Sequence, residues 1–343
     1  MKNRGRLLKI IIPIVTVICS ALFIPWGILA VWISPLPDSV QKEVESAINN
    51  GLDGIIVYVD QGDETSLYSA GWHNRDDKVV ADPEALFKIA SISKLYIAVA
   101  AAKLVDDQMI SLDDNLAVLL PEYAGSIEYS DRITLRMMLQ HRSGIPNYLD
   151  QPDYPWVNPP KNNEKTLQLI LGMPADFTPG EKYSYSNTNY LLIGMIMDKT
   201  LGYSHHRYIK DEILTPLNLN NTYSLLKDVD LNDVMSGYSV GYDSDIKYND
   251  FVNPGGSMLA TAEDVGIFLR ALIDGSLLTN DEQAIYSEIY KYEHTGLLPG
   301  YQSIAKYHKD IDTVVVQFVN TSGGDSWSKS EIIYNRIIRI LQR

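Results

Sequence analysis

The pattern of apolar and polar positions predicts strands near both ends of the chain and helices between them. Four short apolar runs have the length of strands, at residues 54–59, 67–72, 297–306 and 313–320. Residues 110–275 instead have the pattern of helices and long loops, and apolar residues three and four apart indicate a final helix at the C-terminus. We therefore expect an α+β fold, in which both ends of the chain build one sheet flanked by helices and a mainly helical region is inserted.

A separate apolar segment precedes the strands. Residues 10–33 carry no charged side chain, and as a helix they would span roughly 36 Å at about 1.5 Å per residue, enough for a bilayer core. Basic side chains precede the segment and acidic ones follow it, which predicts a cytoplasmic N-terminus and an extracytoplasmic remainder in the cell membrane. We expect a basic tail at 1–9, a transmembrane anchor at 10–33, a linker at 34–37 and one globular domain at 38–343. A cleaved secretion signal is the alternative.

Charge and cysteine content narrow the classes of partner. The 343 residues carry a net charge of −14, so phosphate backbones would repel the protein, which argues against a nucleic-acid partner. The single cysteine, Cys19, lies within the apolar segment. No intramolecular disulfide can form, so the globular domain must depend on its core for stability.

Ser91 and Lys94 are the first candidates for catalysis. They are three residues apart at the start of a strongly apolar helical run, so the amine lies about one turn from the hydroxyl on the same face. An amine kept from water loses part of its preference for the charged form and can act as a base. Two other Ser-x-x-Lys tetrads occur, at 224–227 and 326–329. The first lies near a predicted turn among Asn and Asp residues, and the second precedes the last helix, where an N-cap or surface role explains Ser326 better.

Two more motifs follow the tetrad along the chain. They are Tyr185-Ser186-Asn187 and the triplet that begins at His294 and continues with Thr295 and Gly296. Together with residues 134–146 and 254–264, these segments resemble the serine β-lactamase and penicillin-binding-protein superfamily. The resemblance is to its class C-like branch, which contains DD-carboxypeptidases, D-alanyl esterases and related esterases. It implies a β-lactamase/transpeptidase-like fold with an antiparallel sheet.

The resemblance implies catalytic roles in a covalent reaction of two steps, acylation and hydrolysis. Ser91 is the expected nucleophile, Lys94 its activating partner and Tyr185 the residue that relays protons. His294 takes a position where many β-lactamases have lysine. Because a neutral histidine offers a substrate carboxylate only a hydrogen bond, His294 favours an esterase or peptidase over an efficient β-lactamase.

Substrate-binding roles follow from the same resemblance. Asn187 is expected to donate a hydrogen bond to the substrate, and Thr295 and Gly296 belong to the binding strand. The backbone N–H groups of Ser91 and Leu297 are the expected oxyanion hole. No cofactor and no metal is implied. The implied partners are cell-wall peptides or D-alanylated polymers as substrates, β-lactams as covalent ligands, and the lipid bilayer around the N-terminal helix.

Other motifs support weaker alternatives. Residues 237–241 match G-x-S-x-G, but no helical pattern follows, as an α/β-hydrolase elbow requires. His205 and His206 lack further ligands at metal-binding spacing, so we expect a packed or surface pair. Two alternatives remain for the whole chain: a class C-like β-lactamase, and a catalytically silent penicillin-binding or sensor module.

Overall fold

Both ends of the chain build one antiparallel sheet, as the sequence predicts. The computed structural model describes residues 11–12, 15, 22–62 and 64–343. Six strands lie in the order β3-β2-β1-β10-β9-β8. Their bounds are β1 Gly54–Asp60, β2 Thr65–Asn74, β3 Val79–Val80, β8 His294–Leu298, β9 Tyr301–His308 and β10 Thr313–Val319. The central pair joins the two ends directly, since Ile55 of β1 faces Val319 of β10.

The strand predicted at 297–306 is wrong in one respect. The structure divides this region into β8 and β9, which pair as a hairpin from His294↔Ala305 to Leu298↔Tyr301. Gly300, with φ +79°, makes the turn that connects them. The division matters for function because the predicted third motif opens β8, which is an edge strand of the sheet.

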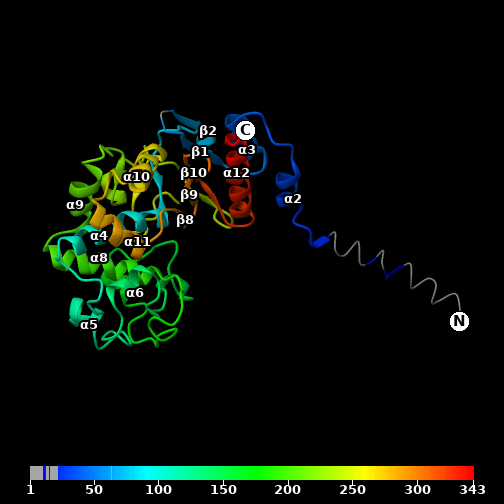
Figure 1. Ribbon diagram of the computed structural model, residues 1–343. Coiled ribbons are helices and arrows are strands. Elements are labelled where there is room, and N and C mark those ends of the chain that lie inside the picture. The colour runs from blue at the N-terminus through cyan, green and yellow to red at the C-terminus, as the bar shows by residue number, and fades with distance from the viewer. Residues whose placement is uncertain (1–10, 13–14, 16–21, 63) are drawn as a thin grey trace, which may run out of the picture.

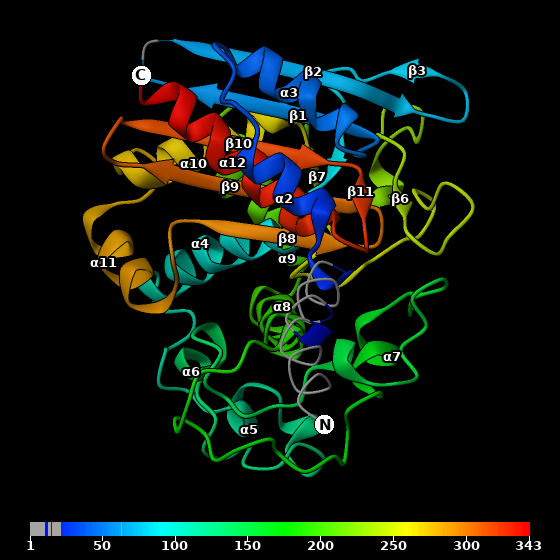
Figure 2. The ribbon, with the colours of Figure 1, turned by 90° about the vertical axis from the view of Figure 1, so that its right-hand side faces the viewer.

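Helices cover both faces of the sheet (Figures 1 and 2). α3 (Val40–Asn49) and α12 (Ser326–Leu341) pack on one face, and α10 (Ala262–Asp274) packs on the other. Every residue of β1 is buried as a result. A strand covered on both faces reads as a continuous apolar run, which is why residues 54–59 show no alternation.

The helical region lies below the sheet in Figure 2 and surrounds two buried helices. α4 (Ser93–Asp106) is buried from Ser93 to Ala102, and α8 (Asn187–Leu201) ends at Gly202 in the left-handed conformation. Shorter helices complete the region: α5 Leu116–Leu119, α6 Leu135–Leu139, α7 Asn163–Leu167, α9 His205–Ile209 and α11 Asn280–Ile289. Short strands lie outside the main sheet: β4 Phe87–Lys88, β5 Thr222–Tyr223, β6 Tyr238–Ser239, β7 Leu259–Ala260 and β11 Thr321–Ser322.

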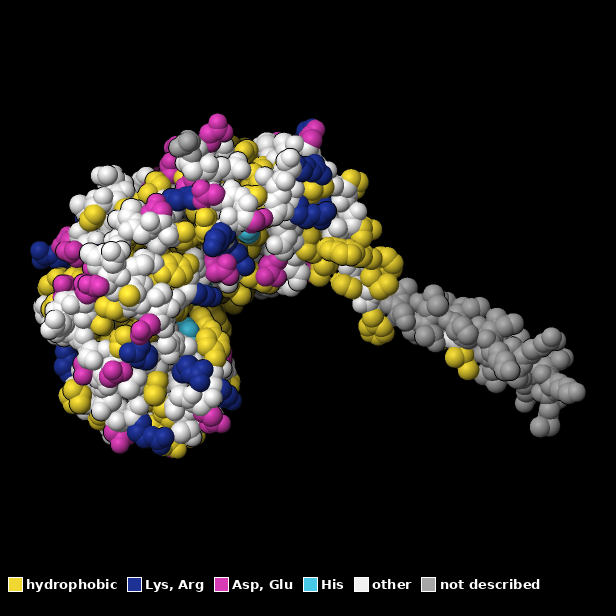
Figure 3. Space-filling view, viewed as in Figure 1, with side chains coloured by type: hydrophobic (Ala, Val, Ile, Leu, Met, Phe, Trp, Pro, Cys, Tyr) yellow, Lys and Arg dark blue, Asp and Glu magenta, His cyan; other side chains and the backbone are white. Residues whose placement is uncertain are grey.

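A short apolar helix precedes the globular domain. α2 (Trp26–Ile33) exposes 59% of Trp26 and 66% of Trp32, and hydrophobic side chains gather around it in Figure 3. No helix among the described residues is both long and apolar enough to cross a membrane. Much of the anchor expected at 10–33, Cys19 included, and the basic tail at 1–9 lie outside the described residues.

Candidate active site

Ser91 lies in a tight turn between a buried strand and a buried helix. β4 leads into a 3₁₀ turn at Ala90–Ile92, and α4 begins two residues after the serine. Ala90 has φ +51°, a backbone conformation that non-glycine residues adopt at a cost and that often marks a functional turn. Ser91 stays partly exposed while the residues on both sides of it are buried. The turn therefore presents the hydroxyl at the surface of a rigid core.

Lys94 is fully buried beside that hydroxyl. Its Nζ lies 3.0 Å from Ser91 Oγ, 2.9 Å from Asn187 Oδ1 and 2.6 Å from the carbonyl oxygen of Gly255. The described residues place no carboxylate in an ion pair with it. Burial, together with the charge of Lys291, lowers the pKa of Lys94 to about 7.

The partners of Lys94 suit a free amine. A neutral amine has two N–H donors, which match the two acceptors Asn187 Oδ1 and Gly255 O. Its lone pair is then left for the proton of Ser91 Oγ. Gly255 permits this approach, because a Cβ at that position would lie 3.0 Å from Lys94 Nζ.

Tyr185 completes the contacts of the serine oxygen. Its hydroxyl donates to Ser91 Oγ at 2.9 Å. Burial raises the pKa of Tyr185 above its usual range, so the phenol keeps its proton at neutral pH and can donate it. Tyr185 precedes α8 by two residues, and this connection brings the second motif to the tetrad.

Two residues that the sequence did not single out hold the second motif in place. Asn147 Oδ1 accepts from the backbone N–H of Asn187 at 3.0 Å and from its side-chain amide at 3.2 Å. His141 stacks on the ring of Tyr185 with centroids 4.4 Å apart, and its Nδ1 accepts from the N–H of Ser186. Burial lowers the pKa of His141 to about 3, so its ring is neutral. The sequence signal for His141 was the helix-and-turn segment at 134–146, which resembled the family without assigning these contacts, and Asn147 directly follows that segment.

β8 brings the third motif to the nucleophile. Gly296 lets the strand approach the turn, because a Cβ there would lie 2.4 Å from Ile89 O and 2.9 Å from Ala90 Cβ. Leu297 is 57% exposed and lines the same narrow cavity as Ser91. This placement fits the expected oxyanion hole, whose two N–H donors stay a prediction.

His294 is buried rather than open to the cavity. Its Nε2 lies 2.7 Å from the hydroxyl of Tyr290, and its Nδ1 contacts the carbonyl oxygen of Thr295. In the neutral tautomer that donates from Nδ1, Nε2 accepts from Tyr290. Burial and the nearby lysines lower the pKa of His294 well below its usual value. A direct contact between His294 and substrate therefore stays a prediction.

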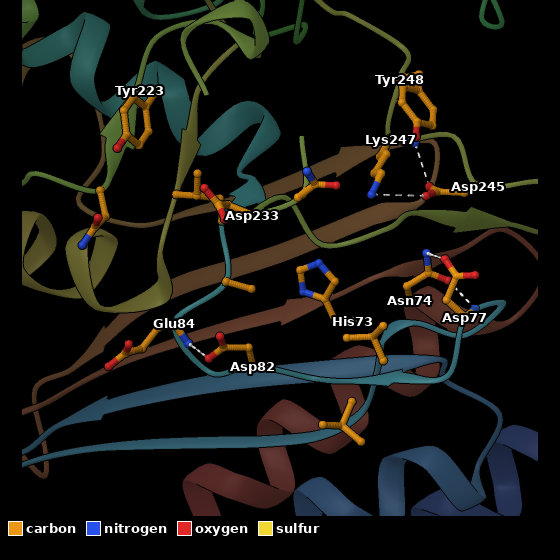
Figure 4. Close-up of a pocket in the computed structure, with 16 residues that line it drawn as sticks. His73, Asn74, Asp77, Asp82, Glu84, Tyr223, Asp233, Asp245, Lys247 and Tyr248 are labelled. Carbon is orange, nitrogen blue, oxygen red and sulfur yellow. Dashed lines mark hydrogen bonds and ion pairs between the residues drawn. The ribbon is translucent and has the colours of Figure 1, made fainter. Parts of the chain in front are cut away.

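A wider cavity of about 660 Å³ lies at the opposite edge of the sheet, beside β2 and β3 (Figure 4). Its walls carry carboxylates and a lysine, among them Asp82, Asp245 and Lys247, but none of the predicted site residues. Without a nucleophile beside a base, it is not the catalytic centre.

The remaining motifs take structural roles. Residues Tyr238–Ser239 form β6, and the next element along the chain is the strand β7 rather than the helix that an elbow requires, so the elbow is excluded. His205 is buried and its Nδ1 lies 2.7 Å from Asp198 Oδ1, as a packed histidine. Among the residues that the structure describes, no group of metal-ligating side chains is large enough to hold an ion. Ser326 is not an N-cap, because Asp325 takes that position and the Ser326 hydroxyl bonds Gln302.

Comparison with known sequences identifies the family. A sequence model described as Beta-lactamase matches residues 40–288. Protein flp of Staphylococcus aureus (strain N315) is 25% identical over 250 residues, covering 68% of this chain and 49% of that protein. Penicillin-binding protein 4* of Bacillus subtilis (strain 168) is 27% identical over 207 residues, covering 59% of this chain and 44% of that protein. The chain thus spans about half the length of these curated relatives.

Solved structures share the fold. D-amino acid amidase from Ochrobactrum anthropi SV3, complexed with D-phenylalanine, superposes with a TM-score of 0.79 at 21% identity, over 90% of this chain and 99% of that one. A penicillin binding protein from Bacillus halodurans superposes with a TM-score of 0.70 at 20% identity, over 86% and 98%. Because this family match covers well over half of its residues, the chain belongs to the β-lactamase family.

Proposed function

We propose that this protein is a membrane-anchored serine hydrolase that releases D-alanyl groups from cell-envelope substrates through an acyl-enzyme on Ser91. One observation carries the proposal. A single oxygen, Ser91 Oγ, lies 3.0 Å from Lys94 Nζ and 2.9 Å from Tyr185 Oη. A serine hydroxyl with a buried amine on one side and a protonated phenol on the other has both a base and an acid within reach.

Acylation uses these groups in turn. Lys94 as a free amine takes the proton of Ser91, and Oγ attacks the substrate carbonyl. The backbone N–H groups of Ser91 and Leu297 stabilise the oxyanion. Tyr185 gives its proton to the leaving oxygen or nitrogen, and the proton on Lys94 restores the phenol. Hydrolysis reverses these transfers, with water in the place of the leaving group.

Three observations support a D-alanyl substrate. His294 is held neutral in the third motif, so it adds no fixed positive charge for the carboxylate that β-lactams carry. The chain has a net charge of −14, which suits a cationic D-alanyl ammonium group better than an anionic polymer. A D-amino acid amidase shares the fold over nearly its whole length.

The membrane anchor and a cytoplasmic N-terminus are part of the proposal. They rest on the uncharged segment at 10–33, the basic residues before it and the exposed apolar side chains of α2. A domain joined to its anchor by residues 34–37 would act on polymers close to the bilayer.

The test is a parallel assay of the full chain in detergent on D-alanylated lipoteichoic acid, a D-Ala-D-Ala peptide and a chromogenic cephalosporin. We expect release of D-alanine that disappears in Ser91→Ala and persists in Ser224→Ala, the serine of another tetrad. Fastest turnover of the cephalosporin would instead indicate a β-lactamase. Labelling of Ser91 by fluorescent penicillin without turnover of any substrate would indicate a silent penicillin-binding module.

A further inference from the structure

A narrow cavity beside Ser91 has the size of one small chemical group. Its volume is about 30 Å³, and its walls include Ser91, Leu298 and the aromatic rings of Tyr148, Tyr154 and Phe251. A space of this size holds one small group such as an ammonium or a methyl. An acyl group bound to Ser91 would place the substituents of its α-carbon close to this cavity.

Two residues that line this cavity each carry a buried polar atom with no partner among the described residues. Asn253 is 5% exposed, and its amide nitrogen donates to the hydroxyl of Tyr148 at 3.1 Å, while its Oδ1 accepts nothing. The hydroxyl of Tyr154, a residue 4% exposed, is also unpartnered. Buried acceptors are normally satisfied, so the unpartnered oxygen of a residue that lines a cavity beside the nucleophile is a candidate acceptor for a bound donor.

The charge of the cavity wall determines which kind of chemical group can bind there. The side chains that line it are neutral, and three of them are aromatic. A carboxylate would face the oxygen of Asn253 and the negative faces of the rings, which is unfavourable. An ammonium would donate to that oxygen and gain cation–π attraction from the rings.

We propose that this cavity is the subsite for the α-ammonium of an α-aminoacyl group carried on Ser91, with Asn253 Oδ1 as its acceptor and Tyr154 as a second contact. The inference rests on the proposed acyl-enzyme and narrows its substrate class. In an aminoacyl ester the nitrogen is two bonds from the carbonyl carbon that Ser91 attacks. It must therefore lie directly beside the serine, where this cavity is.

The subsite also acts on the catalytic base. Ser91, Asn187 and Gly255 line the cavity, and each contacts Lys94 Nζ. A positive charge in the cavity would be separated from Lys94 Nζ only by these residues, and it would disfavour protonation of Lys94. A substrate with an ammonium therefore promotes the free amine that its own acylation needs, whereas a neutral substrate does not.

The test compares the benzyl esters of D-alanine and isobutyric acid, which differ by an ammonium in place of a methyl. Asn253→Leu should lower the ratio of kcat/KM for the two esters (D-alanine over isobutyrate) about 10- to 100-fold. Asn253→Asp should raise that ratio, and Tyr154→Phe should lower it by a smaller factor. Asn232→Asp, at an exposed position, is the matched control and should leave the ratio unchanged.

A second measurement, the pH profile, distinguishes a substrate-binding role of Asn253 from a purely structural one. The acidic limb of the kcat profile should lie at lower pH for the D-alanine ester than for the isobutyrate ester, and Asn253→Leu should reduce this difference. An unchanged ratio in Asn253→Leu, or a ratio lowered by Asn253→Asp, would overturn the inference.

Labelling of Ser91 by an uncharged fluorophosphonate distinguishes the two proposals. If Ser91 is labelled and the isobutyrate ester is hydrolysed without preference for D-alanine, the subsite is wrong and the hydrolase stands. If Ser91 is neither labelled nor acylated, the proposed function itself fails.

Discussion

At the scale of single residues, the environment of one amine sets the chemistry. Lys94 has an alkyl stem inside the core and three oxygens around its nitrogen, and none of these belongs to a carboxylate. An ion-paired lysine would stay charged and could not accept a proton. Burial without an ion pair makes the same side chain a base near neutral pH.

The pH profile tests this assignment. Because the pKa of Lys94 lies at about 7, kcat/KM should rise with pH through that value and then level off, as the free amine becomes dominant. Lys94→Arg keeps a positive charge that cannot be lost, so activity should fall by about 10²–10⁴-fold without recovery at high pH. Lys103→Arg, on the same helix but paired with Glu282, should keep the profile. If kcat/KM of the wild-type protein did not change between about pH 5 and about pH 9, Lys94 would not be the base.

At the scale of elements, the site depends on how closely an edge strand approaches a turn. β8 meets the Ser91 turn at Gly296, where there is no room for a side chain. The oxyanion donors proposed for Ser91 and Leu297 belong to these two elements, so their spacing is set by this contact.

Gly296→Ala should therefore impair catalysis more than stability. The new methyl would lie 2.3 Å from Ser303 Oγ and 2.4 Å from Ile89 O, so β8 must move away from the turn. A shift of about 1 Å can cost on the order of 10² in rate. We expect such a loss in kcat with little change in circular dichroism. Gly125→Ala is the control, because a Cβ at this exposed position would meet no atom within 4 Å. Full activity of Gly296→Ala would show that catalysis does not need the close contact between β8 and the turn.

A second buried lysine fixes the loop that closes the site. Lys88 of β4 donates to the carbonyl oxygens of Lys247 and Asn249, each at 2.6 Å, and the same loop continues to Asn253 and Gly255. Burial lowers the pKa of Lys88 from 10.5 to about 7. The loop that supplies an acceptor to Lys94 is thus held by another lysine, for which the described part of the chain provides no ion pair with a carboxylate.

Stability should depend on pH through Lys88. Between its folded value of about 7 and its unfolded value of 10.5, the unfolded chain binds more protons, so the free energy of unfolding rises with pH. The slope from one such lysine is at most about 1.4 kcal/mol per pH unit. Lys88→Met removes this titrating group and should reduce the slope, as measured by urea unfolding at several pH values. An identical slope in the variant would show that Lys88 does not titrate on folding.

At the scale of the whole molecule, the N-terminal segment is fixed to the C-terminal helix. Arg336 of α12 forms a buried ion pair with Glu43 of α3, at 2.8 Å from Nε to Oε1. The same guanidinium donates to the carbonyl oxygens of Ser34 at 2.7 Å and Pro35 at 2.9 Å. The linker predicted at 34–37 is therefore held against the domain, which would fix the orientation of the domain relative to an anchor.

Breaking this contact should be costly. Arg336→Met leaves the carboxylate of Glu43 buried and unpaired, for which about 3–5 kcal/mol of lost stability is typical. Glu43→Gln combined with Arg336→Met removes the stranded charge and should recover part of that loss. Thermal unfolding measures both, and an equal loss in the single and double variants would contradict a charge-based explanation.

The sequence predicted the sheet, the main helices and the order of the motifs because those signals are local. Ser91 and Lys94 share one helical turn, so their proximity follows from spacing alone. Asn147, His141 and Asn253 were missed because they come from loops without periodicity, and their contacts exist only after the domain packs. The same limit applies to α10, where the Thr261 hydroxyl caps the helix and the carboxylate of Asp264 accepts hydrogen bonds from Asn221 and Thr222.

The central claim is that Ser91 becomes an ester of the substrate's acyl group. The most direct measurement is intact-protein mass spectrometry after rapid acid quench of the protein with a D-alanyl ester, followed by peptide mapping. The account predicts a mass increase of one D-alanyl group on the peptide that contains Ser91, absent in Ser91→Ala and depleted in Tyr185→Phe. Turnover by Ser91→Ala, or an adduct on any other residue, would contradict it.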